Sequence, residues 1–166
     1  LWTTSSNAPV MPSPFCWWID MKPINYKHLG FTGTKRGITP AQRSKLKTVL
    51  SELRLDGFLW MHNGDCGGAD DTAGKLWSTH PINGMVMLHP PDNPKFRAYL
   101  VADITCEPRG YIHRDRHIVL CSHTLVATPG GFEEEVRSGT WTTIRYARTR
   151  RRRIYIIYPD GSVGKE

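Results

Sequence analysis

From residue 26 onward, short apolar runs alternate with segments in which apolar residues recur every three or four positions. The short runs predict strands at 26–31, 57–62, 84–88, 124–128 and 153–158. The periodic segments predict helices at 40–55, 69–78, 111–121 and 140–150. Strands that alternate with helices indicate an α/β, three-layer Rossmann-like domain with a mainly parallel sheet of about five strands.

Capping residues and prolines mark the boundaries of these elements. Thr39 and Gln42 form a predicted capping box around Pro40, at the first position of the helix 40–55. Residues 89–94 contain three prolines and are expected to form a loop. Residues 1–22 are rich in Ser, Thr, Asn and Pro, so we expect an N-terminal arm or extension before a domain spanning 23–166.

The composition indicates one globular domain. The chain has 166 residues, of which 39% are hydrophobic and 22% charged. No apolar run approaches the length of a membrane span, and the start lacks the pattern of a secretory signal. The four cysteines are widely spaced without a CxxC pair, although their even number leaves disulfides open. We therefore expect a cytoplasmic protein with no resident metal or other cofactor.

The net charge of +7 favours anionic partners, from nucleotides to nucleic acid. Much of the excess lies in a cluster of arginines: Arg145, Arg148, Arg150, Arg151, Arg152 and Arg153. One interpretation is a solvated helix end, where cations suit the helix dipole. The other is a nucleic-acid patch, with Trp141, Tyr146 and Tyr155 as nearby aromatic residues that could instead lie in the core.

The first glycine-rich loop lies between the strand at 26–31 and the helix at 40–55. It supplies Gly30, Thr32, Gly33, Thr34, Lys35 and Arg36. Hydroxyls, backbone N–H groups and cations in such a turn can hold phosphate oxygens. The segment matches neither GxGxxG nor the P-loop, so an ordinary strand-to-helix turn is the alternative.

The second glycine-rich loop follows the strand at 57–62 and supplies Asp65, Gly67, Gly68 and Asp70. Acids beside a glycine turn can bind ribose hydroxyls. They can equally cap the helix that starts near residue 69, or supply oxygen ligands to a magnesium ion.

The third region follows the strand at 124–128 and carries two kinds of candidate residue. Gly130 and Gly131 are followed by three acids, Glu133, Glu134 and Glu135, and then by Ser138, Gly139 and Thr140 at a helix start. The last three can form a second anion site at a positive helix end. One of the glutamates could act as a base, or all three could belong to a solvated acidic loop.

The helix at 111–121 carries two further pairs of candidate residues. His113 and His117 share a helix face at a spacing that suits zinc, but Arg114 stands where a metalloprotease has glutamate. Arg114 and Arg116 are better read as forked binders of phosphate or carboxylate. A GxSxG nucleophile turn is absent from the sequence.

All three glycine-rich loops are predicted at the carboxyl ends of strands, where ligands of α/β folds bind. In their order along residues 26–158, these loops and the segments 111–116 and 137–141 resemble the SLOG superfamily, named for the Smf/DprA and lonely-guy (LOG) proteins. The resemblance is to a small, poorly characterised branch. It implies a Rossmann-like fold and a nucleotide-type ligand.

The lonely-guy branch hydrolyses the N-glycosidic bond of nucleoside 5′-monophosphates, and the resemblance places its functional arginine at Arg114. Its catalytic glutamate would fall at Thr143, and glycoside cleavage needs an acidic group. Glu133, Glu134 or Glu135 could replace it.

Other SLOG relatives bind nucleotide-derived signals without catalysis, and DprA relatives bind single-stranded DNA. We therefore predict a sensor or binding module for a phosphate-bearing nucleotide or derivative. The alternatives are an N-glycoside hydrolase and a single-strand nucleic-acid binder. A homodimer is a further possibility that the resemblance implies.

Overall fold

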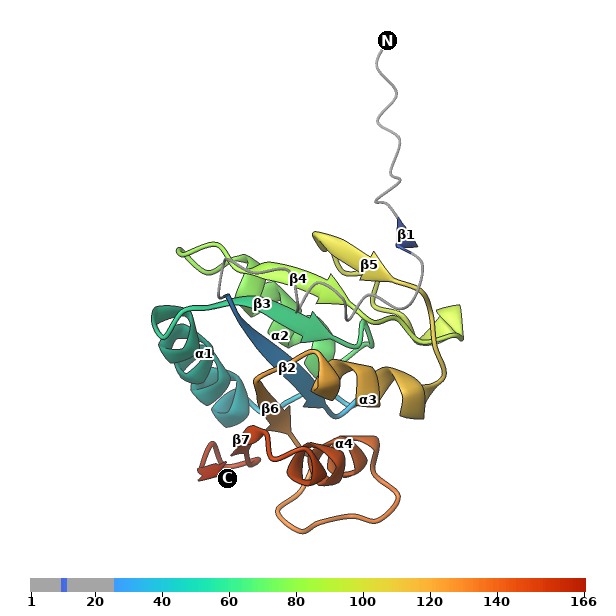
Figure 1. The fold of residues 1–166 in the computed structure, drawn as a ribbon. Helices are drawn as coiled ribbons and strands as arrows, with labels where there is room; N and C mark the ends of the chain where they lie inside the picture. The colour runs from blue at the N-terminus through green and yellow to red at the C-terminus, as the bar shows by residue number, and fades with distance from the viewer. Residues whose placement is uncertain (1–9, 12–25) are drawn as a thin grey trace.

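A central sheet with helices on both faces organises the protein, shown in Figure 1 as a computed structural model that describes residues 10–11 and 26–166. The strands are β1 (Val10–Met11), β2 (Lys27–Gly33), β3 (Phe58–Asn63), β4 (Met85–Leu88), β5 (Ile104–Cys106), β6 (Thr124–Thr128), β7 (Arg153–Ile157) and β8 (Val163–Lys165). The helices are α1 (Pro40–Leu55), α2 (Ala69–Ser78), the 3-10 turn η2 (Pro94–Phe96), α3 (Tyr111–Leu120) and α4 (Gly139–Thr149).

The strands form one sheet in the order β1-β5-β4-β3-β2-β6-β7-β8. Every neighbouring pair is parallel except β7 and β8. The chain builds outward from β2 to β3, β4 and β5 on one side, and from β6 to β7 and β8 on the other. The order therefore changes direction at β2 and β6, which makes the carboxyl ends of these two strands the topological switch point.

The predicted α/β class and mainly parallel sheet are confirmed, but the sheet has eight strands rather than about five. The predicted strands are its centre, β2, β3, β4, β6 and β7. The additional strands β1, β5 and β8 lie at or near the edges and have three residues or fewer. Segments this short carry no measurable alternation, so hydrophobic pattern alone does not indicate them.

Helices α1 and α2 pack on one face of the sheet, and α3 and α4 pack on the other (Figure 1). The first face buries a cluster that includes Phe31, Leu46, Leu50, Met61 and Trp77. The second face buries a separate cluster beneath α4: Val119, Leu125, Ala127, Trp141, Ile144, Ala147, Ile154 and Ile156. Two apolar layers thus hold the sheet between the helix pairs, as in a three-layer fold.

The start of α1 shows how local sequence sets an element boundary. Thr39 Oγ1 accepts a hydrogen bond from the Gln42 N–H, and Gln42 Oε1 accepts one from the Thr39 N–H, both at 3.0 Å. This is the predicted capping box, with Pro40 at the first helical position. It fixes where the loop after β2 ends and α1 begins.

The predicted arm at 1–22 lies outside the described residues, apart from Val10–Met11, which pair with Thr105 and Cys106 of β5. Among the helices of the described residues, none has the length and apolar character needed to cross a membrane.

Candidate functional site

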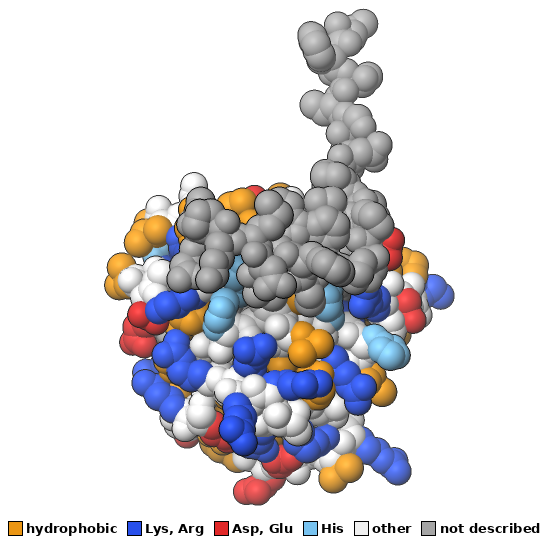
Figure 2. Space-filling model, in the orientation of Figure 1, with side chains coloured by type: hydrophobic (Ala, Val, Ile, Leu, Met, Phe, Trp, Pro, Cys, Tyr) orange, Lys and Arg blue, Asp and Glu red, His pale blue; other side chains and the backbone are white. Residues whose placement is uncertain are grey.

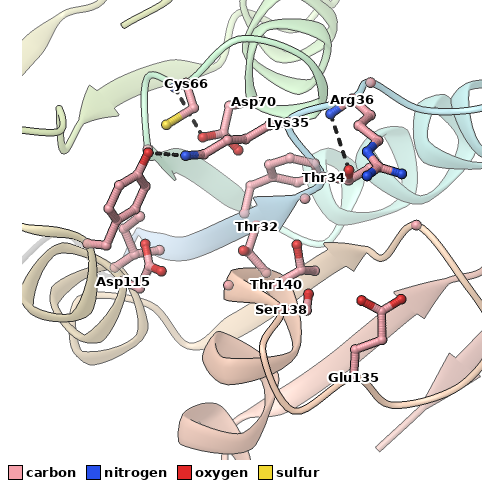
Figure 3. Close-up of a pocket in the computed structure, with 18 of the residues that line it drawn as sticks. Thr32, Thr34, Lys35, Arg36, Cys66, Asp70, Asp115, Glu135, Ser138 and Thr140 are labelled. Atoms are coloured by element: carbon pink, nitrogen blue, oxygen red, sulfur yellow. Dashed lines mark hydrogen bonds between the residues drawn. The ribbon is translucent and has the colours of Figure 1, made fainter. Parts of the chain in front are cut away.

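A pocket of about 420 Å³ opens at the carboxyl ends of β2 and β6, within the usual range for small-molecule sites (Figure 3). The predicted residues that line it are Thr32, Gly33, Thr34, Lys35, Arg36, Asp70, Arg114, Gly130, Glu135, Ser138, Gly139 and Thr140. All three glycine-rich loops and α3 therefore contribute to one cavity. The predicted residues outside its lining are Gly30, Asp65, Gly67, Gly68, Gly131, Glu133 and Glu134.

The loop after β2 is fixed on both sides by backbone hydrogen bonds. The Thr34 N–H donates to the Thr128 carbonyl at 3.2 Å, and the Thr34 carbonyl accepts from the Ala69 N–H at 3.1 Å. The loop therefore passes between the end of β6 and the start of α2. A Cβ atom at Gly33 would lie 2.3 Å from Thr128 Oγ1 and 2.4 Å from Ala69 Cβ, so only glycine fits there.

The amino end of α4 forms one wall of the pocket. Ser138 is the N-cap, and its hydroxyl accepts from the Trp141 N–H at 3.4 Å. Gly139 and Thr140 follow, and the first turn contains no acidic side chain. Figure 3 shows Ser138 and Thr140 close to Thr32 of β2. Helix N–H groups, the positive end of the helix dipole and these hydroxyls together favour an anion.

Lys35 lies between two aromatic rings beside the pocket. Its ammonium donates to the Tyr111 hydroxyl and lies 4.0 Å from the centroid of the Tyr111 ring and 4.6 Å from that of Phe96. These contacts position the ammonium group, but none of the three partners carries a negative charge that would neutralise it. The lysine is thus a cation available to an anion in the pocket.

A cluster of two acids, an arginine and a cysteine forms the other wall. Arg114 donates to Asp115 Oδ1 from Nε at 3.0 Å and from Nη2 at 2.8 Å. Its Nη1 lies 3.1 Å from Cys66 Sγ. Asp70 Oδ2 accepts from the Cys66 N–H at 3.2 Å. Arg114 therefore joins α3 to the loop after β3.

Burial sets the protonation behaviour of this wall. It raises the pKa of Asp70 to about 7, even though Arg114 and the Cys66 N–H act in the opposite direction. It also raises the pKa of Asp115, against the lowering effects of Arg114 and of the Thr143 side chain. The pKa of the Cys66 thiol is raised by burial as well. A carboxyl group in the pocket can thus gain or lose a proton near neutral pH.

Two solved structures share this fold. The molybdenum cofactor binding protein from Rippkaea orientalis has 17% identity and a TM-score of 0.63, with 82% of this chain and 78% of that chain covered. The molybdenum cofactor carrier protein from Chlamydomonas reinhardtii has 19% identity and a TM-score of 0.59, with 80% and 76% covered. Neither a family model nor a curated protein matches the chain. The similarities support the Rossmann-like fold, and the resemblance to SLOG proteins stays a prediction.

Asp65 has a structural use away from the pocket. It is fully buried, and its carboxylate accepts from Arg97 Nε at 2.6 Å and from the Leu100 N–H at 3.0 Å. It therefore holds the segment after η2 against the loop after β3. Gly30 also lies outside the lining. A Cβ atom on Gly30 would lie 2.7 Å from Ser122 Oγ and 3.1 Å from Ile118 Cγ2 of α3, so glycine lets α3 and the turn after it pack closely on β2.

The acidic loop and the arginine cluster are partly engaged with each other. Glu134 pairs with Arg145 at 3.1 Å and with Arg148 at 2.8 Å, and Arg148 also pairs with Glu166 at 2.7 Å. Figure 2 shows Lys and Arg side chains spread over the face that α3 and α4 form. Part of the predicted basic cluster is thus neutralised within the chain.

The two histidines on α3 lie in different surroundings. His113 is exposed, whereas His117 Nδ1 lies 3.1 Å from His89 Nδ1. Within residues 10–11 and 26–166, no group of three or more His, Cys, Asp or Glu side chains is arranged to hold a metal ion.

Several lining residues were not predicted as site residues, among them Cys66, Tyr111 and Asp115. Tyr111 and Asp115 flank Arg114 on α3, and the only sequence signal for Asp115 is its position next to that arginine. Gln42 also lines the pocket, although its pattern indicates only a helix cap.

Proposed function

We propose that the pocket binds a phosphate-bearing nucleotide or nucleotide-derived ligand and that the protein acts as a sensor or binding module. The observation that carries the proposal is that the loop after β2 and the amino end of α4 line the same cavity. Each alone is a common structural feature. Together they direct hydroxyls, backbone N–H groups and the Lys35 ammonium toward one space of about 420 Å³.

The phosphate would lie against the wall formed by Thr32, Ser138, Gly139 and Thr140. Thr32 and Thr140 are mostly buried, so their hydroxyls have few competing contacts with water. Lys35 would turn from the Tyr111 hydroxyl to the phosphate, exchanging an uncharged partner for a charged one. This exchange supports a specific role for Lys35 in binding.

The opposite wall suits the uncharged part of the ligand. Asp70, Asp115 and Arg114 offer acceptors and donors at fixed positions, which match hydroxyl groups or ring nitrogens. The two structures of similar fold are described as binding or carrying molybdenum cofactor, which is a phosphate-bearing, nucleotide-derived molecule. Their ligand therefore belongs to the proposed chemical class.

Mass spectrometry of small molecules released on denaturation would identify a co-purified ligand. A panel of nucleoside monophosphates, molybdenum cofactor and inorganic phosphate is then tested by thermal shift. A ligand at 100 times its Kd stabilises the folded protein by about 2.7 kcal/mol.

Thr140→Val should weaken binding of the active ligand at least tenfold, because it removes a hydrogen bond to a charged group, worth about 1.5–3 kcal/mol.

Thr142→Val is the matched control, because Thr142 is also in the first turn of α4 but is exposed and outside the pocket lining. The proposal fails if no member of the panel shifts the melting temperature, or if the two threonine variants bind the active ligand equally.

A second candidate function is hydrolysis of the N-glycosidic bond of a nucleoside 5′-monophosphate. The observation that favours it is Asp115, whose carboxylate lines the pocket and lies near Thr143, the position at which the resemblance expects glutamate. Of the three glutamates proposed as its replacement, Glu135 alone lines the pocket. Water would add across the C1′–N bond, giving ribose 5-phosphate and free base.

Chromatography of the same panel after incubation distinguishes this candidate from simple binding. Hydrolysis predicts free base that is lost in Asp115→Asn, and Glu133→Gln provides a control outside the pocket. Absence of free base alongside a thermal shift would support the sensor. A homodimer and binding of single-stranded nucleic acid stay predictions, to be tested by light scattering and by salt-dependent oligonucleotide titration.

A further inference from the structure

Four histidines form a continuous row of imidazole rings outside the pocket. His28 Nδ1 lies 2.8 Å from His62 Nε2, and His62 Nδ1 lies 2.8 Å from His89 Nε2. His89 Nδ1 lies 3.1 Å from His117 Nδ1. We refer to His28, His62, His89 and His117 as the histidine ladder. It runs from β2 through the end of β3 and the residue after β4 to α3.

The parallel register of the sheet produces this row. His62 of β3 lies opposite Gly30 of β2, and His28 precedes Gly30 by two residues on the same face. The row therefore climbs diagonally toward the carboxyl edge of the sheet. His62 and His89 are each only 2% exposed, so their polar atoms depend on one another for hydrogen bonds. The nitrogens therefore meet in pairs rather than at one point, as a chain of hydrogen-bonded rings.

Counting hydrogens limits how many protons the ladder can hold. Each of its three links needs one N–H donor and one bare nitrogen acceptor. Four neutral rings carry one hydrogen each, so three occupy the links and one occupies an outer nitrogen, Nε2 of His28 or of His117. One further proton on the other outer nitrogen leaves all three links intact. A second one must enter a link, where two N–H groups would then face each other.

Within the described residues, the charged groups around the ladder also oppose a second proton. Arg109 and Arg114 act on His89, and Arg109 acts on His117. The groups that act on His62 are other histidines. At the other end, His123 Nδ1 accepts from the His28 N–H at 3.0 Å and is itself near Lys27 and Arg152. Every one of these groups is cationic or becomes cationic in acid, so repulsion adds to the cost of burial.

We propose that the histidine ladder is an acid-sensitive switch that accepts one proton with its links intact and opens between His89 and His117 when a second proton binds. That link is the longest of the three. It is also the one that joins the sheet to a helix. His28 and His62 lie on strands that are paired by their backbones, so separating them would break the sheet.

Opening the link between His89 and His117 would affect the pocket wall. His117 is on α3, and the same helix carries Tyr111, Arg114 and Asp115 in the pocket wall. Opening the link loosens the helix that forms this wall. The effect on ligand affinity rests on the proposed function, whereas the test below uses no ligand and so can fail or succeed independently of it.

Amide hydrogen exchange of α3, corrected for the intrinsic effect of pH, tests the switch. Opening that takes up one proton becomes about tenfold more frequent for each unit of falling pH. We therefore expect the protection of residues 111–120 in the native protein to fall by about tenfold per pH unit in the acid range, while β3 stays protected. Nitrogen-15 spectra of the imidazoles should show one proton entering before this change.

Two variants on the same helix make the test specific. His117→Gln removes the fourth ring and should make protection of α3 nearly independent of pH, at whatever level it starts. His113→Gln alters an exposed histidine outside the ladder and should behave as the native protein does. Equal pH dependence in both variants, or α3 protection that stays flat in the native protein, overturns the proposal. Two or more protons entering the ladder with α3 still protected would also overturn it.

Discussion

Arg114 and Asp115 are adjacent in the chain and are also joined by two hydrogen bonds, of 3.0 and 2.8 Å, in the pocket wall. Successive helix residues point about 100° apart, so neighbours rarely pair. The long arginine side chain reaches back to Asp115 and still presents Nη1 to Cys66. The charge of Arg114 thus offsets the carboxylates of Asp115 on α3 and of Asp70 on α2.

Replacing Arg114 by methionine should destabilise the protein by about 3–5 kcal/mol, because buried Asp70 and half-buried Asp115 would lose the arginine that offsets their charge. Urea denaturation at pH 7.5 measures the change. Arg116→Met, at an exposed site on the same helix, should cost less than about 1 kcal/mol. Similar losses in the two variants would show that the buried pair has no special structural importance.

Asp70→Asn should change how stability depends on pH. The folded pKa of Asp70, about 7, lies above its ordinary value of 3.8, so the folded state binds more protons between these limits. The contribution of this group to stability is thus fully present below pH 3.8 and is lost as the pH rises to about 7. Asparagine keeps an acceptor for the Cys66 N–H and does not ionise.

We expect the Asp70→Asn variant to gain stability relative to the native protein by up to about 1.4 kcal/mol per pH unit within that window. Urea titrations at pH 4.5, 6 and 7.5 measure the difference. A difference that is the same at all three values would contradict the raised pKa.

Gly68→Ala should destabilise the protein by about 1–3 kcal/mol or more, since Gly68 has φ +82° and a Cβ atom would lie 2.4 Å from the Lys35 carbonyl. It should also displace the loop that carries Lys35 and weaken ligand binding. Gly67→Ala is the matched control, with no atom within 4 Å of the added Cβ. Thermal unfolding compares the two variants, and Gly68→Ala should melt at the lower temperature. Equal melting temperatures would show that residue 68 does not require glycine.

The central fold could be predicted because its signals are local. The capping box of Thr39 and Gln42 and the apolar face of 40–55 determine α1, whose predicted and observed bounds agree. The short strands β5 and β8 depend instead on pairing with distant residues, which three-residue segments do not encode. The same limit applies to the site.

Glycine and hydroxyl residues after a strand indicate an anion site from sequence alone, and most of those predicted line the pocket. The direction in which a side chain points cannot be predicted in the same way. Asp65 lies in the loop after β3 with a positive φ, and its carboxylate contacts Arg97. Asp70, five residues later in the first turn of α2, lines the pocket instead. Asp115 becomes recognisable only when α3 is placed against the loop after β3.

Gln42 connects three elements, and its replacement tests how the pocket is held in shape. Its Nε2 donates to the Pro129 and Ile157 carbonyls, both at 2.9 Å, so α1 is tied to the loop after β6 and to the end of β7. Gln42→Met leaves both carbonyls without this donor and removes half of the capping box. We expect a loss of about 2–5 kcal/mol in the free energy of unfolding, since each unsatisfied buried acceptor costs about 1–3 kcal/mol. Arg43→Met, at the next and exposed position, should change the free energy of unfolding by less than about 0.5 kcal/mol.

Because Pro129 precedes Gly130 in the pocket lining, Gln42→Met should also weaken ligand binding at a temperature where the variant is fully folded. A folded variant that binds with native affinity would show that the loop after β6 holds its position without Gln42.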